Sequence, residues 1–206
     1  MSWFNPDAIR ADFEQTLTNY FYPPEFNALI SYQPETLVRF GGLIFSNFVE
    51  CTGVAPPSYF WLKTGQALKP IYENVDSTFD SSGSLRIQIF WGGTANESIG
   101  CPNGSLRSVE GTLVCWIITS RGRGTSTGLA EGARLRSVLN SWNTLSSCGD
   151  CVRVSAIRGP SVFESPKGSD FYAHIVSCSL TAMERVPSLR QADDESATVI
   201  LDGDFL

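Results

Sequence analysis

Apolar residues recur at helical spacing near the start of the chain. They are Ile9, Phe13, Leu17 and Tyr20. Positions three or four residues apart lie on one face of an α-helix, so this stripe is assigned to the core. Asn5 can cap the free amides of the first turn, Pro6 is tolerated at the first helical position, and Pro23-Pro24 forbids continuation. The pattern therefore predicts a helix over about residues 6–21.

The next segment alternates apolar stretches with residues that interrupt helices and strands. The interruptions are Pro23-Pro24, Pro34, Gly41-Gly42, Pro56-Pro57 and Pro70. Between them, the run from Leu37 to Val49 fits either a short helix or a strand. The segment is rich in Phe, Tyr, Leu and Val, which is not typical of disorder. We interpret residues 22–70 as an apolar insertion that packs on the main sheet or on a neighbouring subunit.

From residue 85 the apolar period becomes two. The residues that share one face are Leu85, Ile87, Ile89 and Trp91. This alternation predicts a half-buried strand that ends at Gly92-Gly93. A second strand is predicted over residues 107–119. Its segment 113–118 is apolar at every position, so we expect this part of the strand to be covered on both faces.

A glycine-rich connection follows the second strand and leads into a helix over about residues 128–142. Thr127 or Gly128 can cap this helix, and the carboxylate of Glu131 suits the positive end of the helix in its first turn. The stripe that we expect to be buried is Leu135, Val138, Leu139 and Trp142. This helix is therefore predicted to pack on the sheet.

Two more strands are predicted, over residues 152–158 and 171–185. The segment between them, 159–168, is too long for a tight hairpin, so we expect a protruding loop. The order of elements is helix, insertion, two strands, helix and two strands, which is typical of an α+β fold. We predict a single α+β domain over residues 1–186, with a mixed or antiparallel sheet of about four to five strands flanked by the two helices.

The composition is that of a folded protein, and it argues against a protein that coats nucleic acid by neutralising its phosphates. The 206 residues are 42% hydrophobic, and the formal net charge is −6. A protein that neutralises phosphates needs an excess of positive charge instead. Five of the acidic groups lie in residues 187–206. We interpret that stretch as a solvated acidic tail rather than as an arm that docks on a partner.

The sequence also bears on where the protein is made. Its first residues have neither a basic region nor an apolar run, so no signal peptide is predicted, and no stretch is apolar enough to span a bilayer. We expect synthesis in a cytosol and no membrane partner. The cysteines are Cys51, Cys101, Cys115, Cys148, Cys151 and Cys178. In a protein that is not exported they are expected to be reduced and partly buried.

One motif raises the alternative of a serine hydrolase. Gly124-Thr-Ser126-Thr-Gly128 matches the pattern of a nucleophile elbow, and His174 follows later, in the chain order of an esterase triad. However, several residues separate Ser126 from the end of the preceding strand, whereas an elbow places its serine directly there. His174 also alternates with apolar residues along a strand, which favours a core or interface histidine. We therefore predict no catalytic residues.

Two other motifs could indicate a cofactor or a metal. The glycine spacing around residues 122–128 does not fit the dinucleotide or nucleoside-triphosphate loops, so no cofactor is predicted. Arg121 and Arg123 are instead interpreted as exposed donors for a partner's carboxylates or a phosphate. Cys148 and Cys151 have the spacing of half a zinc site, but no second pair at a matching spacing exists. No metal is predicted.

Several short sequence segments, taken in their order along the chain, resemble a known protein family. They are Ile71-Tyr-Glu-Asn-Val75, the strand Leu85–Gly92, the strand Arg107–Ile118, the Gly-Thr-Ser-Thr-Gly loop before a helix, and the strand, loop and strand from Val152 to Tyr172. In this order, with the capped N-terminal helix, they resemble the tail terminator, or tail-completion, proteins of tailed bacteriophages. The resemblance covers residues 5–21 and 71–186; residues 22–70 depart from it.

The resemblance implies a structural and non-enzymatic role. Such proteins form a hexameric ring at the head-proximal end of the tail tube, stop its polymerisation and present a surface to the head's connector. The implied partners are further copies of the chain, the tail tube protein and the connector or stopper protein, while DNA passes through the ring without specific binding. The implied location is the virion, at the head-proximal end of the tail. Another neck or connector protein of the virion is the alternative.

A ring subunit needs surfaces that meet its neighbours, and the sequence offers candidates. Trp116 lies in the strand that is apolar on both faces, and Arg121 and Arg123 directly follow that strand. Phe163 and Lys167 lie in the predicted protruding loop. Sheet edges, apolar faces and long loops are the usual contact elements of such assemblies. These five residues are the predicted subunit or tube interface.

Overall fold

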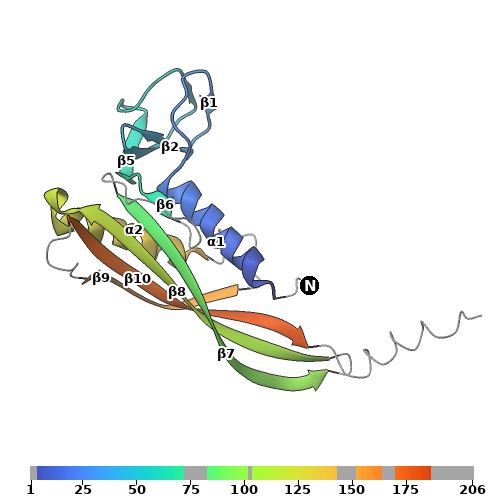
Figure 1. Cartoon of the computed structure of the whole chain (residues 1–206). Coiled ribbons are helices and arrows are strands. Elements are labelled where there is room, and N and C mark those ends of the chain that lie inside the picture. The colour runs from blue at the N-terminus through green and yellow to red at the C-terminus, as the bar shows by residue number, and fades with distance from the viewer. Residues whose placement is uncertain (1–3, 72–82, 102–103, 143–151, 164–169, 187–206) are drawn as a thin grey trace, which may run out of the picture.

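The computed structural model describes residues 4–71, 83–101, 104–142, 152–163 and 170–186. Within these residues it contains two α-helices and ten strands in three sheets, which confirms the α+β class (Figure 1). The Glu-Asn motif near residue 73, the Cys148/Cys151 pair, Lys167 and the acidic tail lie outside the described residues. The predictions for them are not tested by the structure.

The main sheet has five strands in the order β6-β7-β8-β10-β9. Its strands are β6 (Lys69–Ile71), β7 (Ser84–Cys101), β8 (Gly104–Ser120), β9 (Val152–Phe163) and β10 (Phe171–Val186). β6 runs parallel to β7, and the other neighbours are antiparallel. The predicted mixed sheet is therefore confirmed.

The strands are longer than the sequence pattern predicts. β7 does not end at Gly92-Gly93 but continues to Cys101, with a register shift between Gly92 and Ala95. A β-bulge absorbs the extra residues there, so the glycines bend the strand rather than end it. The predicted loop at 159–168 is also partly wrong, because Gly159 to Phe163 belong to β9.

The first helix, α1 (Pro6–Phe21), forms where the sequence predicts it. The side-chain oxygen of Asn5 accepts hydrogen bonds from the backbone N–H groups of Asp7 and Ala8, both at 3.1 Å, which is the predicted cap. Ile9, Phe13, Leu17 and Phe21 are buried. Tyr20 is only half-buried. The helix thus presents one apolar face to the sheet.

The second helix, α2 (Gly124–Asn140), begins four residues before the predicted start, after the short 3₁₀ segment η1 (Arg121–Arg123). Neither Thr127 nor Gly128 caps it, since both lie inside the helix. Gly128 is there for packing: a Cβ at this position would overlap the ring of His174. The predicted stripe of Leu135, Val138, Leu139 and Trp142 is buried.

Both helices lie on the same side of the main sheet (Figure 1). One apolar core joins them to the sheet. Most of its sheet residues come from alternate positions of three strands, β7, β8 and β10, and Val152 of β9 joins them. The residues from these three strands are Leu85, Ile87, Ile89, Leu113, Cys115, Ile117, Val176, Cys178, Leu180 and Ala182. The rings of Phe13 and Trp142 stack with centroids 3.7 Å apart, which ties α1 to the end of α2.

Residues 22–67 form a smaller β unit that projects beyond the helices (Figure 1). It contains β1 (Ser31–Tyr32), β2 (Leu37–Phe40), β3 (Leu43–Asn47), β4 (Cys51–Thr52) and β5 (Trp61–Gln66), arranged as the sheets β1-β4 and β2-β3-β5. The run from Leu37 to Val49 is therefore mainly two strands, joined at Gly41-Gly42, where both φ angles are positive. A separate small core fills the unit: Tyr32, Val38, Phe45, Cys51 and Trp61.

The unit leaves and rejoins the main body at one place. The backbone N–H of Leu68, which follows the unit, donates to the carbonyl oxygen of Phe21, the last residue of α1, over 2.8 Å. Both residues are fully buried in the main core. We call residues 22–67 the inserted unit.

Candidate interaction surface

One face of the main sheet is not packed against either described helix. Residues opposite each other in an antiparallel pair project from the same face, so the strand registers define that face row by row. The row Arg86–Trp116–Ile175–Ser161 lies on it, and so do the rows Gln88–Val114–Ser177–Arg158 and Phe90–Thr112–Ser179–Ser155. We call this surface the open face.

An aromatic pair lies at one end of the open face. Trp116 and Phe163 meet edge to face with ring centroids 5.8 Å apart, and the indole Nε1 of Trp116 donates to Oε1 of Gln88 at 3.1 Å. Phe163 is 51% exposed although the Trp116 ring is beside it. The expectation that segment 113–118 is covered on both faces is therefore wrong in part, since Val114 and Trp116 are only half-buried.

The other end of the open face is hollowed and polar. A depression of about 520 Å³ lies over β7, β8, β10 and β9 and is lined on this face by Phe90, Glu110, Thr112, Ser155, Ser179 and Thr181. Arg153 and Arg158 project beside it, opposite Thr181 and Ser177. Over β7, β8, β10 and β9, the described charged side chains on this face are those of Arg86, Arg153, Arg158 and Glu110. This face is thus locally basic in a chain of net charge −6.

Among the predicted interface residues whose side chains are described, Trp116 and Phe163 are brought together, whereas Arg121 lies apart from them. Arg121 lies at the far end of β8, where its backbone N–H donates to the carbonyl oxygen of Asp170 and its guanidinium lies 5.5 Å from the centre of the Tyr172 ring. Tyr172 pairs with Thr119, on the face that carries the helices. Arg121 is exposed there, away from the open face. Nothing is described of the Arg123 side chain.

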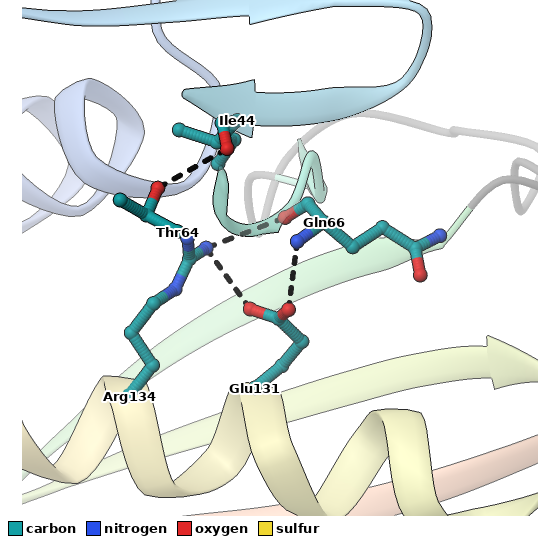
Figure 2. Close-up of polar contacts among 5 residues, drawn as sticks. All are labelled: Ile44, Thr64, Gln66, Glu131 and Arg134. Carbon is teal, nitrogen blue, oxygen red and sulfur yellow. Dashed lines mark hydrogen bonds and ion pairs between the residues drawn. The ribbon is translucent and has the colours of Figure 1, made fainter. Parts of the chain in front are cut away.

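A polar contact that the sequence analysis missed joins the inserted unit to α2 (Figure 2). The carboxylate of Glu131 accepts the backbone N–H of Gln66 at 2.7 Å and pairs with Nη2 of Arg134 at 3.0 Å. The same nitrogen of Arg134 is 3.3 Å from the carbonyl oxygen of Gln66. These two side chains therefore bind both backbone polar groups of Gln66, the last residue of β5.

The environment of this contact is tight and largely buried. Glu131 is 5% exposed, and a Cβ on Gly65 would overlap the Arg134 guanidinium. Burial raises the pKa of Glu131, and the nearby Arg134 opposes that shift. The guanidinium of Arg134 also lies over the ring of Phe21 at 4.2 Å. A cavity of about 620 Å³ opens beside the contact, lined by Lys63, Thr64, Ser126 and Thr127 among others.

The sequence pattern predicts that Glu131 lies in the first turn of a helix that starts near residue 128, and this is wrong because α2 starts at Gly124. It lies in the second turn of α2 and faces the inserted unit. The signal that was available is a Glu and an Arg three residues apart, on one side of a helix. Their spacing indicates an ion pair, but nothing in it indicates that Gln66 is the third partner.

The alternative of a serine hydrolase finds no support in the arrangement of Ser126 and His174. His174 is fully buried behind Gly128, and burial lowers its pKa. Ser126 is exposed and lines the cavity on the other side of α2. Residues two apart on a helix point in nearly opposite directions, so Ser126 is directed away from the histidine that Gly128 contacts.

Three of the cysteines are buried thiols. Cys51, Cys115 and Cys178 are free, and the last two lie near each other in the main core. Burial raises the pKa of Cys115 and Cys178, that of Cys178 to about 12. Both are therefore protonated at neutral pH. Within the described part of the chain, no three His, Cys, Asp or Glu side chains gather as a metal site would require.

Comparison with known proteins adds no relative. The sequence matches no described protein family, and no curated protein matches it. Neither described helix has the length and apolar content needed to cross a lipid bilayer.

Proposed function

We propose that this chain is a structural, non-enzymatic protein of a phage virion, the tail terminator, and that it closes into a hexameric ring on the head-proximal end of the tail tube. The observation that carries the proposal is the order of elements in residues 5–21 and 71–186, which resembles that family, together with a sheet that leaves one face uncovered by both described helices. Synthesis takes place in the host cytoplasm, and no cofactor or metal takes part.

The open face supports an assembly role because monomeric proteins rarely expose contiguous apolar surface without a partner. Trp116, Phe163 and Ile175 are neighbours there, and the tryptophan is the kind of residue that anchors protein interfaces. A ring requires a heterologous contact, in which two different surfaces of one chain meet. The open face supplies one of the two surfaces.

The charge of the chain supports passage of DNA through the ring. A net charge of −6 lowers the affinity for phosphate, so DNA is expected to move without specific binding. Arg121 is exposed at an end of the sheet and offers a guanidinium to a carboxylate of the tube protein or of the next subunit. The third partner is the connector or stopper protein of the head.

A second candidate is another neck or connector protein of the virion. Such a protein would also form a ring but would bind different virion proteins. The two are separated by adding the tube protein. A terminator caps growing tubes and fixes their length, whereas a connector protein leaves the length distribution unchanged. Imaging of negatively stained tubes measures both the cap and the length.

The assembly itself is tested by mass-resolved sizing of the wild type and of Phe163→Glu. Phe163 is 51% exposed, so its replacement should leave the fold intact while adding a charge to the apolar end of the open face. The matched control is Leu129→Glu, at a 38% exposed leucine of α2 on the helix side. We expect rings from the wild type and the control and subunits from Phe163→Glu. A wild type that stays monomeric with the tube protein present overturns the proposal.

A further inference from the structure

The inserted unit exposes more apolar surface at its outer end than a monomer requires. The residues that form this surface, here named the insertion tip, are Leu29, Ile30, Phe48, Val49 and Tyr59. Leu29 is 90% exposed and Tyr59 is 80% exposed. Leu29 and Ile30 directly precede β1, Phe48 and Val49 precede β4, and Figure 1 shows β1 at the end of the unit farthest from the helices.

The insertion tip is held in a defined shape. The buried side-chain amide of Asn47 donates to the carbonyl oxygens of Tyr32 and Val49, at 3.0 and 2.9 Å. The backbone N–H of Phe48 donates to the carbonyl oxygen of Phe60 at 3.3 Å. Loops that are fixed by such bonds lose little conformational freedom on binding, which favours their use as contact surfaces.

The charges at the insertion tip are acidic. Glu50 lies between Val49 and β4, and Glu35 follows β1; both are exposed. The segments 27–36 and 47–60 contain no Lys or Arg. Oε1 of Glu50 accepts hydrogen bonds from Ser31 and Gln33, which orient the carboxylate. The insertion tip is therefore an apolar protrusion with fixed negative charge beside it.

The open face has the complementary properties. It is hollowed by about 520 Å³ beside Arg153 and Arg158, it has apolar residues at one end, and its described arginines outnumber the single Glu110. Within one chain the two surfaces do not meet, because the inserted unit lies on the helix side of the main sheet (Figure 1). A second copy is the partner that brings them together.

We propose that the insertion tip of one subunit docks on the open face of the next subunit, with Glu50 beside the hollow. The proposal rests on the ring proposed above and names its second surface. The contact is heterologous, since it joins two different parts of the chain, and repetition of such a contact closes a ring when the rotation allows it. Glu50 faces Arg153 and Arg158 across the contact, and the apolar residues of the insertion tip lie against the aromatic end of the open face.

Charge reversal with rescue tests the pairing. The double variant Arg153→Glu, Arg158→Glu places negative charges opposite Glu50. Because like charges repel, the protein concentration needed for half-assembly should rise about tenfold or more. Adding Glu50→Arg to that variant should restore most of the assembly, although Glu50→Arg alone weakens it. The matched control, Arg136→Glu, reverses an exposed arginine of α2 and should assemble as the wild type does.

A photo-crosslinking residue in place of Tyr59 gives a direct readout. We expect crosslinks between subunits, to peptides that contain residues 108–116 or 152–163. Crosslinks within one chain, or rings whose crosslinks fall elsewhere, overturn this inference and leave the ring intact. Rescue of the Arg153 and Arg158 variant by reversal of Asp193, Asp194 and Glu195, in place of Glu50, also overturns it, because the acidic C-terminal segment then occupies the hollow. A wild type that forms no ring overturns the proposed function itself.

Discussion

Removing the carboxylate of Glu131 is the most informative perturbation of the fold. Glu131→Ala leaves the guanidinium of Arg134 without its ion-pair partner and the backbone N–H of Gln66 without its acceptor. Loss of one partner of a buried pair typically costs about 3–5 kcal/mol. The side chain of Arg134 is 20% exposed, so water compensates part of that loss. Its contacts with the carbonyl of Gln66 and the ring of Phe21 also remain. We therefore expect the free energy of unfolding to fall by about 3 kcal/mol, the lower end of that range.

Urea unfolding followed by tryptophan fluorescence measures this loss. With a slope of about 2 kcal/mol per molar urea, the midpoint should fall by roughly 1.5 M. Arg136→Ala, at an exposed position of the same helix, should stay within about 0.5 kcal/mol of the wild type. Hydrogen exchange adds a local readout, because the amide of Gln66 should lose its protection in Glu131→Ala.

A double-mutant cycle gives the sharpest refutation. If the pair acts as described, Arg134→Ala should cost less in the Glu131→Ala background than in the wild type, because the unpaired charge is removed along with its cost. Strictly additive losses, or a Glu131→Ala variant as stable as Arg136→Ala, would show that the contact in Figure 2 does not fix the inserted unit on α2.

Three further outcomes follow from the core. Burial lowers the pKa of His174, so the folded state binds fewer protons at this residue than the unfolded state does. The free energy of unfolding should therefore fall as the pH drops below about 6.5. In His174→Leu this dependence on pH should be weaker, as measured by unfolding both proteins over a range of pH. Gly128→Ala should destabilise by about 1–3 kcal/mol through overlap with His174, despite the better helix propensity of Ala, whereas Ser137→Ala should not. Cys115 and Cys178 should resist alkylation at pH 8 in the folded protein and react once urea unfolds it, as read by peptide mass spectrometry; rapid labelling of the folded protein would contradict their burial.

The sequence alone predicts the elements whose pattern depends on local rules. Asn5 caps α1, and the buried alternation in β7 starts at Leu85 as expected. The pattern fails where glycine serves packing rather than a turn. The local pattern makes Gly128 a possible cap at the start of the helix, but its missing Cβ makes room for the ring of His174, which lies 46 residues later in the chain. Such a contact depends on tertiary structure, which no local pattern contains.

The candidate interaction surface also has parts that the sequence predicts and parts that it does not. Trp116 is recognisable because segment 113–118 of its strand is apolar at every position, which requires more cover than two helices on one side of the sheet provide. The hollow beside Arg153 and Arg158 is not recognisable, because it depends on the registers of four strands. The insertion tip was also missed, since exposed Leu and Tyr look the same in a sequence as buried ones.

The hydrogen bond between Phe21 and Leu68 has a consequence for how such a protein can change over generations. The polypeptide departs from the main body and returns to it at adjoining points, so recombination that replaces everything between them keeps the strand order of the main sheet. The cost of closing a loop grows only slowly with its length, and segments of quite different size are therefore tolerated at such a junction. The chain can thus acquire a different segment in place of residues 22–67 by an exchange of gene fragments, while the main body keeps its residues and its strand order.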